Sequence, residues 1–197
     1  MSETDKSTIA AGRRIVLRDR LPSDLESQIR WRSQGEWLRF DAPWEARPSL
    51  VTDEAKENFR RGFLERCKET PPFPRQQATI AKRTGEPLGW VNRYAHERFP
   101  MAWSIGIDIC EDPYLNQGIG TEALRLWVDY LFAHSDAHRL GIDTWSFNPR
   151  MVRVAEKLGF RFEGARREML QWQGQWLDQL HYGMLRSEWQ RSDDRQR

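Results

Sequence analysis

The chain has 197 residues, which is enough for one large domain with a substantial core and disfavours interpretations with several domains. Its 31 lysines and arginines nearly balance 29 acidic residues, giving a net charge of +2. The two signs are interleaved along the chain, which argues against a dedicated nucleic-acid-binding protein with a basic stripe. An aromatic content of 12%, with 10 tryptophans, is too high for a disordered polymer.

The N-terminal segment predicts neither a signal peptide nor a membrane anchor. It carries Glu3, Asp5 and Lys6 and has no long apolar run, and no window of the chain approaches the roughly 18 apolar residues of a membrane span. We therefore expect a cytoplasmic protein without membrane contact. Cys67 and Cys110 have no metal-ligand spacing with the four histidines, so neither a metal site nor a disulfide framework is expected.

Hydrophobic periodicity and capping residues predict one domain at 13–189, flanked by flexible tails at 1–12 and 190–197. Ser23 is expected to cap the first helix and Thr52 the second. The predicted strands are 14–19, 77–83, 88–94, 103–110, 139–144, 160–168 and 180–185, and the predicted helices are 23–32, 52–68, 118–133 and 149–158. Residues 35–49 are expected to form a structured loop between the first two helices.

A glycine loop joins the strand at 103–110 to the helix at 118–133. Gly118 and Gly120 permit backbone angles that let consecutive N–H groups converge at the helix N-terminus, where the helix dipole favours an anion. The loop matches neither the Walker pattern nor the dinucleotide fingerprint, because the lysine and the third glycine are absent. It is either a phosphate-binding cradle or simply a tight loop at a helix start.

The segment downstream makes the first interpretation more specific. Asn148-Pro149 follows the strand at 139–144, and the next helix closes on the sequence VAEKLGF at 154–160. Together with the glycine loop, this order resembles the GNAT superfamily of acetyl-CoA-dependent N-acetyltransferases. Gly-Thr-Glu-Ala-Leu at 120–124 is similar to its RimJ/RimL-type branch. The resemblance implies an α+β fold of three layers, with a mixed, mostly antiparallel central sheet and helices on both faces.

The resemblance also implies where acetyl-CoA binds. Loop amides would hold the pyrophosphate, the end of the strand at 103–110 would pair with the pantetheine arm, and Asn148 would bond to it. The implied residues are Ile109, Cys110, Glu111, Asn116, Gln117, Gly118, Ile119, Gly120, Thr121 and Asn148. Two positions depart from the family pattern. Leu115 replaces the usual Arg or Gln, and Ala155 stands where many members place the tyrosine that protonates the leaving thiolate.

Transfer of an acetyl group to an amine requires a base near the thioester. Asp108 is the first candidate, because it is a lone carboxylate in an otherwise apolar strand, and some aminoglycoside N-acetyltransferases of the superfamily carry a similar Gly-Ile-Asp. Alternatively, Asp108 faces solvent or pairs with an arginine. Glu111 and Tyr114 are weaker catalytic candidates.

Aromatic and acidic residues in the N-terminal half predict a binding wall for a cationic amine. The candidates are Trp37, Asp41, Trp44, Trp90 and Asn92, although the tryptophans could equally be core residues. The acceptor is expected to be a protein N-terminus or a small polyamine or aminoglycoside-like amine. One alternative is a coenzyme-A-binding regulatory module of the same fold, and a more distant one is a nucleotide-binding protein. A homodimer is compatible with the C-terminal aromatics.

Overall fold

A computed structural model describes residues 7–45 and 50–194 and contains an eight-stranded sheet in the order β1-β2-β3-β4-β5-β6-β8-β7. Neighbouring strands are antiparallel except for β5 and β6, which are parallel. The strands are β1 Thr8–Ala11, β2 Ile15–Arg18, β3 Gln77–Lys82, β4 Pro87–His96, β5 Phe99–Ile109, β6 Arg139–Trp145, β7 Arg161–Trp172 and β8 Gln175–Leu185. The predicted mixed, mostly antiparallel sheet is therefore confirmed.

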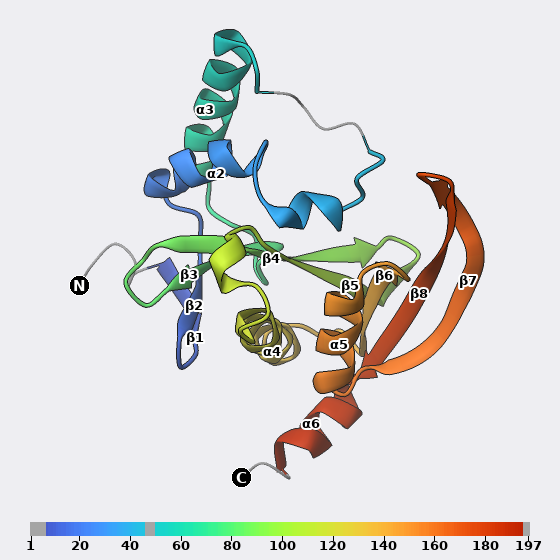
Figure 1. Ribbon diagram of the computed structural model, residues 1–197. Helices are drawn as coiled ribbons and strands as arrows, with labels where there is room; N and C mark the ends of the chain where they lie inside the picture. Colours follow the sequence, from blue (N-terminus) through green and yellow to red (C-terminus); the bar gives the residue numbers. More distant parts are fainter. Residues whose placement is uncertain (1–6, 46–49, 195–197) are drawn as a thin grey trace.

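Helices cover both faces of this sheet. The α-helices are α2 Leu25–Trp31, α3 Asp53–Lys68, α4 Ile119–Ala133, α5 Pro149–Lys157 and α6 Arg186–Asp194, and the 3-10 helices are η1 Pro22–Asp24, η2 Glu36–Arg39 and η3 Asp112–Tyr114. In Figure 1, α2 and α3 lie on one side of the sheet and α4 and α5 on the other. The long β7–β8 hairpin curves toward the α2 side. The three-layer architecture expected from the sequence is confirmed.

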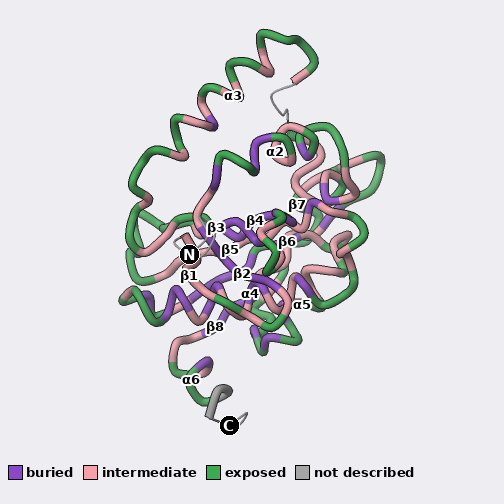
Figure 2. The backbone as a smooth tube through the Cα atoms, turned by 90° about the vertical axis from the view of Figure 1, so that its left-hand side faces the viewer, coloured by how far each residue is buried: buried purple, intermediate pink, exposed green. Residues whose placement is uncertain are grey.

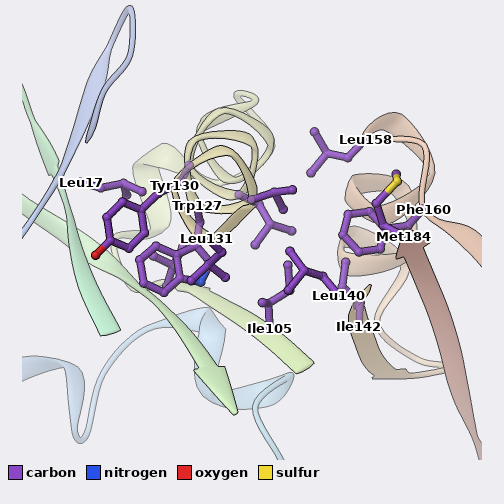
Figure 3. Packing of buried hydrophobic residues seen from close by; sticks show 14 of the residues in the cluster. Leu17, Ile105, Trp127, Tyr130, Leu131, Leu140, Ile142, Leu158, Phe160 and Met184 are labelled. Atoms are coloured by element: carbon purple, nitrogen blue, oxygen red, sulfur yellow. The ribbon is translucent and has the colours of Figure 1, made fainter. Parts of the chain in front are cut away.

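The main core lies between the sheet and α4, whose apolar face is the strongest helical pattern in the sequence. Trp127 and Leu131 are fully buried, and they lie among strand residues such as Leu17 and Ile105 (Figure 3). Figure 2 shows buried residues concentrated in the strands and α4, whereas α3 is mostly exposed and buries Phe63. The α4 face is thus rigidly packed, which fixes the N-terminus of this helix relative to β5.

Two of the predicted helix boundaries are confirmed and one is wrong. Thr52 Oγ1 accepts a hydrogen bond from Ala55 N at 3.1 Å, and Gly159 follows the C-cap of α5 with φ of +81°. Ser23, however, lies within η1 and does not cap α2. Asp24 occupies the N-cap position of α2 without a side-chain hydrogen bond to that helix, and its carboxylate instead accepts the Leu21 N–H at 3.0 Å at the start of η1.

The predicted tails are too long at both ends. Thr8–Ala11 forms β1 because it pairs with β2 and packs Ile9 against the core, and α6 continues to Asp194. Residues 1–6 and 195–197, and 46–49 of the predicted loop, lie outside the described residues. The last two strands also extend beyond their predicted ends. They continue to pair with each other up to Trp172 and Gln175. The side chains of β7 are largely exposed, so the sequence there has no alternation of apolar and polar residues that would predict a strand.

The sheet divides in its middle. The ladder between β5 and β6 ends at Ser104 and Gly141. Beyond that point β5 stays paired with β4 as far as Ile109, while β6 stays paired with β8 as far as Trp145. The two parallel strands therefore separate and leave an opening between them, with unpaired backbone along its edges.

Candidate active site

A cavity of about 430 Å³ occupies the opening between β5 and β6. It is bounded by residues 105–109 of β5, residues 143–145 of β6, the glycine loop and one side of α5. Sequence analysis placed the exposed strand edge at 109–111. The structure places the cavity-lining part of β5 earlier in the strand, because the ladder to β6 already ends at Ser104.

The glycine loop forms one end of the cavity. Gly118 is the N-cap of α4 with φ of +80°, and Asn116 also has a positive φ of 58°, so the chain turns sharply and leaves the first N–H groups of the helix available. A Cβ atom at Gly120 would lie 3.8 Å from Ile107 Cδ1, which is an ordinary contact, so a methyl group would fit there. Asn116, Gly118, Gly120 and Thr121, which sequence analysis expected to bind the cofactor, line the cavity.

Two other predicted loop residues have structural roles. Ile119 is buried in the core, and Gln117 is exposed with its amide donating to the Pro113 carbonyl oxygen. Neither side chain lines the cavity, although the backbone of both belongs to the loop.

Arg14, the residue immediately before β2, braces the loop. The Arg14 guanidinium donates to Glu122 Oε2 at 2.9 Å and to the Gln117 carbonyl oxygen at 2.7 Å, and the Arg14 N–H donates to Glu122 Oε1 at 2.8 Å. Partial burial opposes ionisation of Glu122, but these hydrogen bonds prevail and hold its pKa below the usual range. Glu122 also lies in the first turn of α4, where a carboxylate is favoured by the helix dipole.

Helix α5 contributes a basic wall that sequence analysis missed. Arg150, Arg153 and Lys157 all line the cavity, and their spacing of three and four residues was the signal that could have revealed it. Arg150 pairs with Glu36 at 2.8 Å. Asn148 also lines the cavity, and its Oδ1 accepts the Met151 N–H at 3.1 Å, which caps the helix.

The opposite wall of the cavity is acidic. Asp41, Asp108 and Asp143 line it, together with Tyr94. Asp108 is half-buried and faces this cavity, where it lies opposite Trp90 in the β4–β5 ladder. Burial and the charges of Asp108, Asp41 and Glu45 together raise the pKa of Tyr94. An acidic wall of this kind favours a cation.

Cys110 and Glu111 lie outside the cavity. Cys110 is buried beside Trp31 and Trp37, its N–H donates to the Leu88 carbonyl oxygen at 2.8 Å, and burial strongly raises the pKa of its thiol. The Glu111 carboxylate accepts the Trp31 indole N–H at 2.8 Å and pairs with Arg30, so it fastens α2 to the end of β5. Tyr114 does line the cavity, with Lys82 Nζ 4.6 Å from its ring centroid.

The predicted aromatic wall divides into two parts. Trp37 lines the cavity, and Trp90 packs edge-on against it, with ring centroids 5.2 Å apart. Trp44 lies outside the cavity lining and packs against Trp145 at 4.8 Å, so it connects the loop after η2 to the end of β6. Trp90 instead lines a neighbouring cavity of about 920 Å³.

This neighbouring cavity is continuous with the first, because both are lined by Trp37, Asp41, Asn92 and Tyr94. It extends under α3, where Arg20 and Arg66 form part of its wall. Partial burial and the Arg66 charge lower the pKa of Arg20. The shared part thus contains the carboxylate of Asp41, and the rest of the second cavity has arginines together with Asp19, Glu45 and Glu69 in its lining.

The arrangement matches one family over most of the chain. Residues 14–161 match the model of the acetyltransferase (GNAT) domain, which is well over half of the sequence. The chain belongs to the GNAT acetyltransferase family. It is an N-acetyltransferase, and the family uses acetyl-CoA as the acetyl donor.

Individual relatives agree with this assignment. Aminoglycoside N(6')-acetyltransferase type 1 of Klebsiella pneumoniae is 26% identical over 160 residues, covering 76% of this chain and 75% of the relative. A GNAT-family acetyltransferase structure from Bacillus anthracis aligns with a TM-score of 0.69 at 19% identity, covering 91% and 99% of the two chains. A spermidine N-acetyltransferase SpeG chimera that includes the Vibrio cholerae protein aligns with a TM-score of 0.66 at 16% identity, covering 89% of this chain and 98% of the chimera. The two structures show a shared fold.

The described residues contain neither a membrane-spanning helix nor a metal-ligand cluster. Within residues 7–45 and 50–194, no helix is long and apolar enough to cross a membrane. The same part of the chain contains no cluster of three or more His, Cys, Asp or Glu side chains placed to hold a metal ion.

Proposed function

We propose that this enzyme transfers the acetyl group of acetyl-CoA to a primary amine on a cationic small molecule of the polyamine or aminoglycoside type. The observation that carries the proposal is the polarity of the cavity between β5 and β6. Its lining combines the glycine loop and the basic residues of α5 with three aspartates, Asp41, Asp108 and Asp143. An anionic donor and a cationic acceptor would thus meet at the opening in the sheet.

The donor half fits coenzyme A. The place of Gly118 and Gly120 in the cavity lining and the N–H groups at the start of α4 suit a pyrophosphate, and Arg153 and Lys157 supply positive charge nearby. The unpaired edge of β5 at residues 105–109 offers backbone groups to an extended pantetheine arm, in the manner of an added strand. Leu115 in place of Arg or Gln leaves these backbone donors unchanged.

Acetyl-CoA supplies an activated acetyl group and a thiolate leaving group. In the proposed reaction Asp108 holds the ammonium of the acceptor and accepts its proton, which leaves a neutral nitrogen able to attack the carbonyl. The C–N bond forms, the C–S bond breaks, and the further proton lost by the nitrogen passes to the departing thiolate. Ala155, where many relatives have tyrosine, is fully buried in the core and faces away from the cavity. The hydroxyl groups that line the cavity belong to Tyr94, Tyr114, Ser104 and the two threonines Thr121 and Thr144.

The size and charge of the acceptor side favour a small molecule. The two connected cavities offer room for a molecule of several rings, and the acidic part lies next to the opening in the sheet. Relatives named for aminoglycoside and spermidine acetylation support this class. A ribosomal-protein-S5-alanine acetyltransferase from Vibrio fischeri has the same fold at 23% identity, and a protein N-terminus of the RimJ/RimL type is the competing acceptor.

The proposal is tested by calorimetric titration of acetyl-CoA, followed by thiol release with matched panels of aminoglycosides, polyamines and peptides. We expect binding of acetyl-CoA and turnover with one of the first two panels. Turnover confined to peptides would overturn the acceptor class. Binding without turnover on any panel would instead support a coenzyme-A-binding regulatory module, which the absence of the family tyrosine at Ala155 would explain.

A further inference from the structure

A second carboxylate lies across the opening from Asp108. Asp108 belongs to β5 and Asp143 to β6, and both line the same cavity. Both also lie on the face that carries Ser104, because Ser104 is paired with Gly141 at the last rung of the ladder and alternate residues share a face. The two carboxylates therefore flank the point where the strands separate.

Asp143 is held in a fixed orientation by two side-chain contacts, one from a histidine and one from a serine. His181 Nδ1 lies 2.6 Å from Asp143 Oδ1, and Ser104 Oγ donates to Asp143 Oδ2 at 3.1 Å. An ionised carboxylate can only accept, so the hydrogen of this contact lies on His181 Nδ1. His96 Nε2 lies 3.3 Å from Ser104 Oγ and fixes the hydroxyl in turn.

The position of His181 costs free energy. Its Nε2 is buried and has no hydrogen-bond partner among the described residues, which is destabilising for a polar atom. The imidazole is thus placed for its contact with Asp143. This contact uses one lone pair of Oδ1 and leaves the carboxylate, with 46% of the side chain exposed, accessible from the cavity.

Besides Ser104, the side chain that contacts Asp143 is a histidine, and no lysine or arginine among the described residues is bonded to its carboxylate. The nearest basic group on its own strand, Arg139, is engaged in a two-point ion pair with Glu163 of β7. No lysine or arginine in the part of the chain that the structure describes forms an ion pair with Asp143. An oriented carboxylate that faces a cavity and has no lysine or arginine partner is a site for a cation supplied by a ligand.

We propose that Asp143 anchors a second ammonium group of the acceptor, while Asp108 holds the amine that is acetylated. The enzyme then selects diamines and polyamines over monoamines by binding them at two points, one on each side of the divided sheet. Asp143 is a binding residue in this scheme, and His181 and Ser104 are positioning residues that act through it. The inference rests on the proposed function.

The test compares straight-chain α,ω-diamines of three to eight carbons with alkylamines of the same length. For wild type we expect kcat/KM at least tenfold higher for the best diamine than for its matched monoamine. Asp143→Asn should raise KM for that diamine about tenfold, keep kcat within twofold and leave the monoamine unchanged. His181→Leu should raise the diamine KM by a smaller factor. Asp136→Asn, an exposed aspartate outside both cavities, is the matched control.

Equal losses for diamine and monoamine in Asp143→Asn, or a fall in kcat without a change in KM, would overturn the anchor. Unchanged acetyl-CoA binding shows that a variant is folded, and Asp143→Ser serves as the second variant if Asp143→Asn fails this check. Calorimetric titration of the diamine into the coenzyme A complex measures the anchor without turnover. If no amine releases thiol, the proposed function fails, yet this titration of wild type and Asp143→Asn still decides the anchor.

Discussion

Replacing Gly120 by glutamate should abolish acetyl-CoA binding while the fold is retained. Gly120 lies in the first turn of α4 without a positive φ, and a Cβ there meets Ile107 Cδ1 at 3.8 Å and Ile109 Cγ1 at 3.9 Å, which are ordinary contacts. A methyl group is therefore tolerated. A longer side chain must extend into the space where we place the pyrophosphate, and its carboxylate would replace an attractive site by a repulsive one.

The magnitude follows from Coulomb's law. Two unit charges about 4 Å apart repel by about 4 kcal/mol at an effective dielectric constant of 20. Because 1.4 kcal/mol corresponds to a factor of ten, Gly120→Glu should weaken binding by roughly a thousandfold. Glutamine has nearly the same shape as glutamate without the charge, so Gly120→Gln should lose much less acetyl-CoA affinity than Gly120→Glu. Gly120→Ala should stay within about threefold of wild type.

Calorimetric titration of acetyl-CoA into the four proteins, with thermal unfolding of each, separates these effects. We expect the order wild type, Ala, Gln, Glu in decreasing affinity, with unfolding temperatures close to one another. If Gly120→Glu binds acetyl-CoA within threefold of wild type, the loop is not the pyrophosphate cradle. If Gly120→Gln weakens acetyl-CoA binding as much as Gly120→Glu does, the size of the side chain rather than its charge causes the loss, and the electrostatic argument is wrong.

Three further changes test the base, the core and the brace. Asp108→Asn should lower kcat at least a hundredfold and leave acetyl-CoA affinity within twofold, and a rate within twofold of wild type would remove Asp108 as the base. Asp24→Ala should cost about 3–5 kcal/mol in urea unfolding, because it leaves the guanidinium of Arg18, bonded to Asp24 at 2.6 and 2.7 Å, buried and unpaired, and a loss under 1 kcal/mol would contradict this. The pKa of Glu122 is lowered in the folded protein, so its contribution is complete above the usual Glu pKa and disappears as the pH falls through the folded value. Glu122→Gln should accordingly cost about 1 kcal/mol at pH 7 and nothing in strong acid, and a loss independent of pH would show that Arg14 does not depend on this charge.

Local patterns in the sequence determined most of the elements. The apolar face of α4, the Thr52 cap and the Gly159 terminus are short-range signals, and each was read from residues within a few positions of one another. The glycine loop could be predicted for the same reason, since its φ angles and the start of α4 depend on local chain geometry.

Contacts between distant segments decided what sequence analysis missed. β1 exists because it pairs with β2, and Glu111 proved to hold Trp31 and Arg30, which lie some 80 residues earlier. The separation of β5 from β6 likewise depends on the partner that each strand takes, which no local pattern records.

The sequence by itself indicated the family, and it pointed to the glycine loop and Asp108 as candidate site residues, because these depend on residues grouped within short stretches. Only the tertiary structure placed Asp143, Ser104 and His181 in one hydrogen-bonded group beside Asp108, since the three come from β6, β5 and β8. Their carboxylate, hydroxyl and imidazole are ordinary polar residues in isolation. Strand pairing brings them together, so that Ser104 and His181 orient the Asp143 carboxylate at the opening of the sheet.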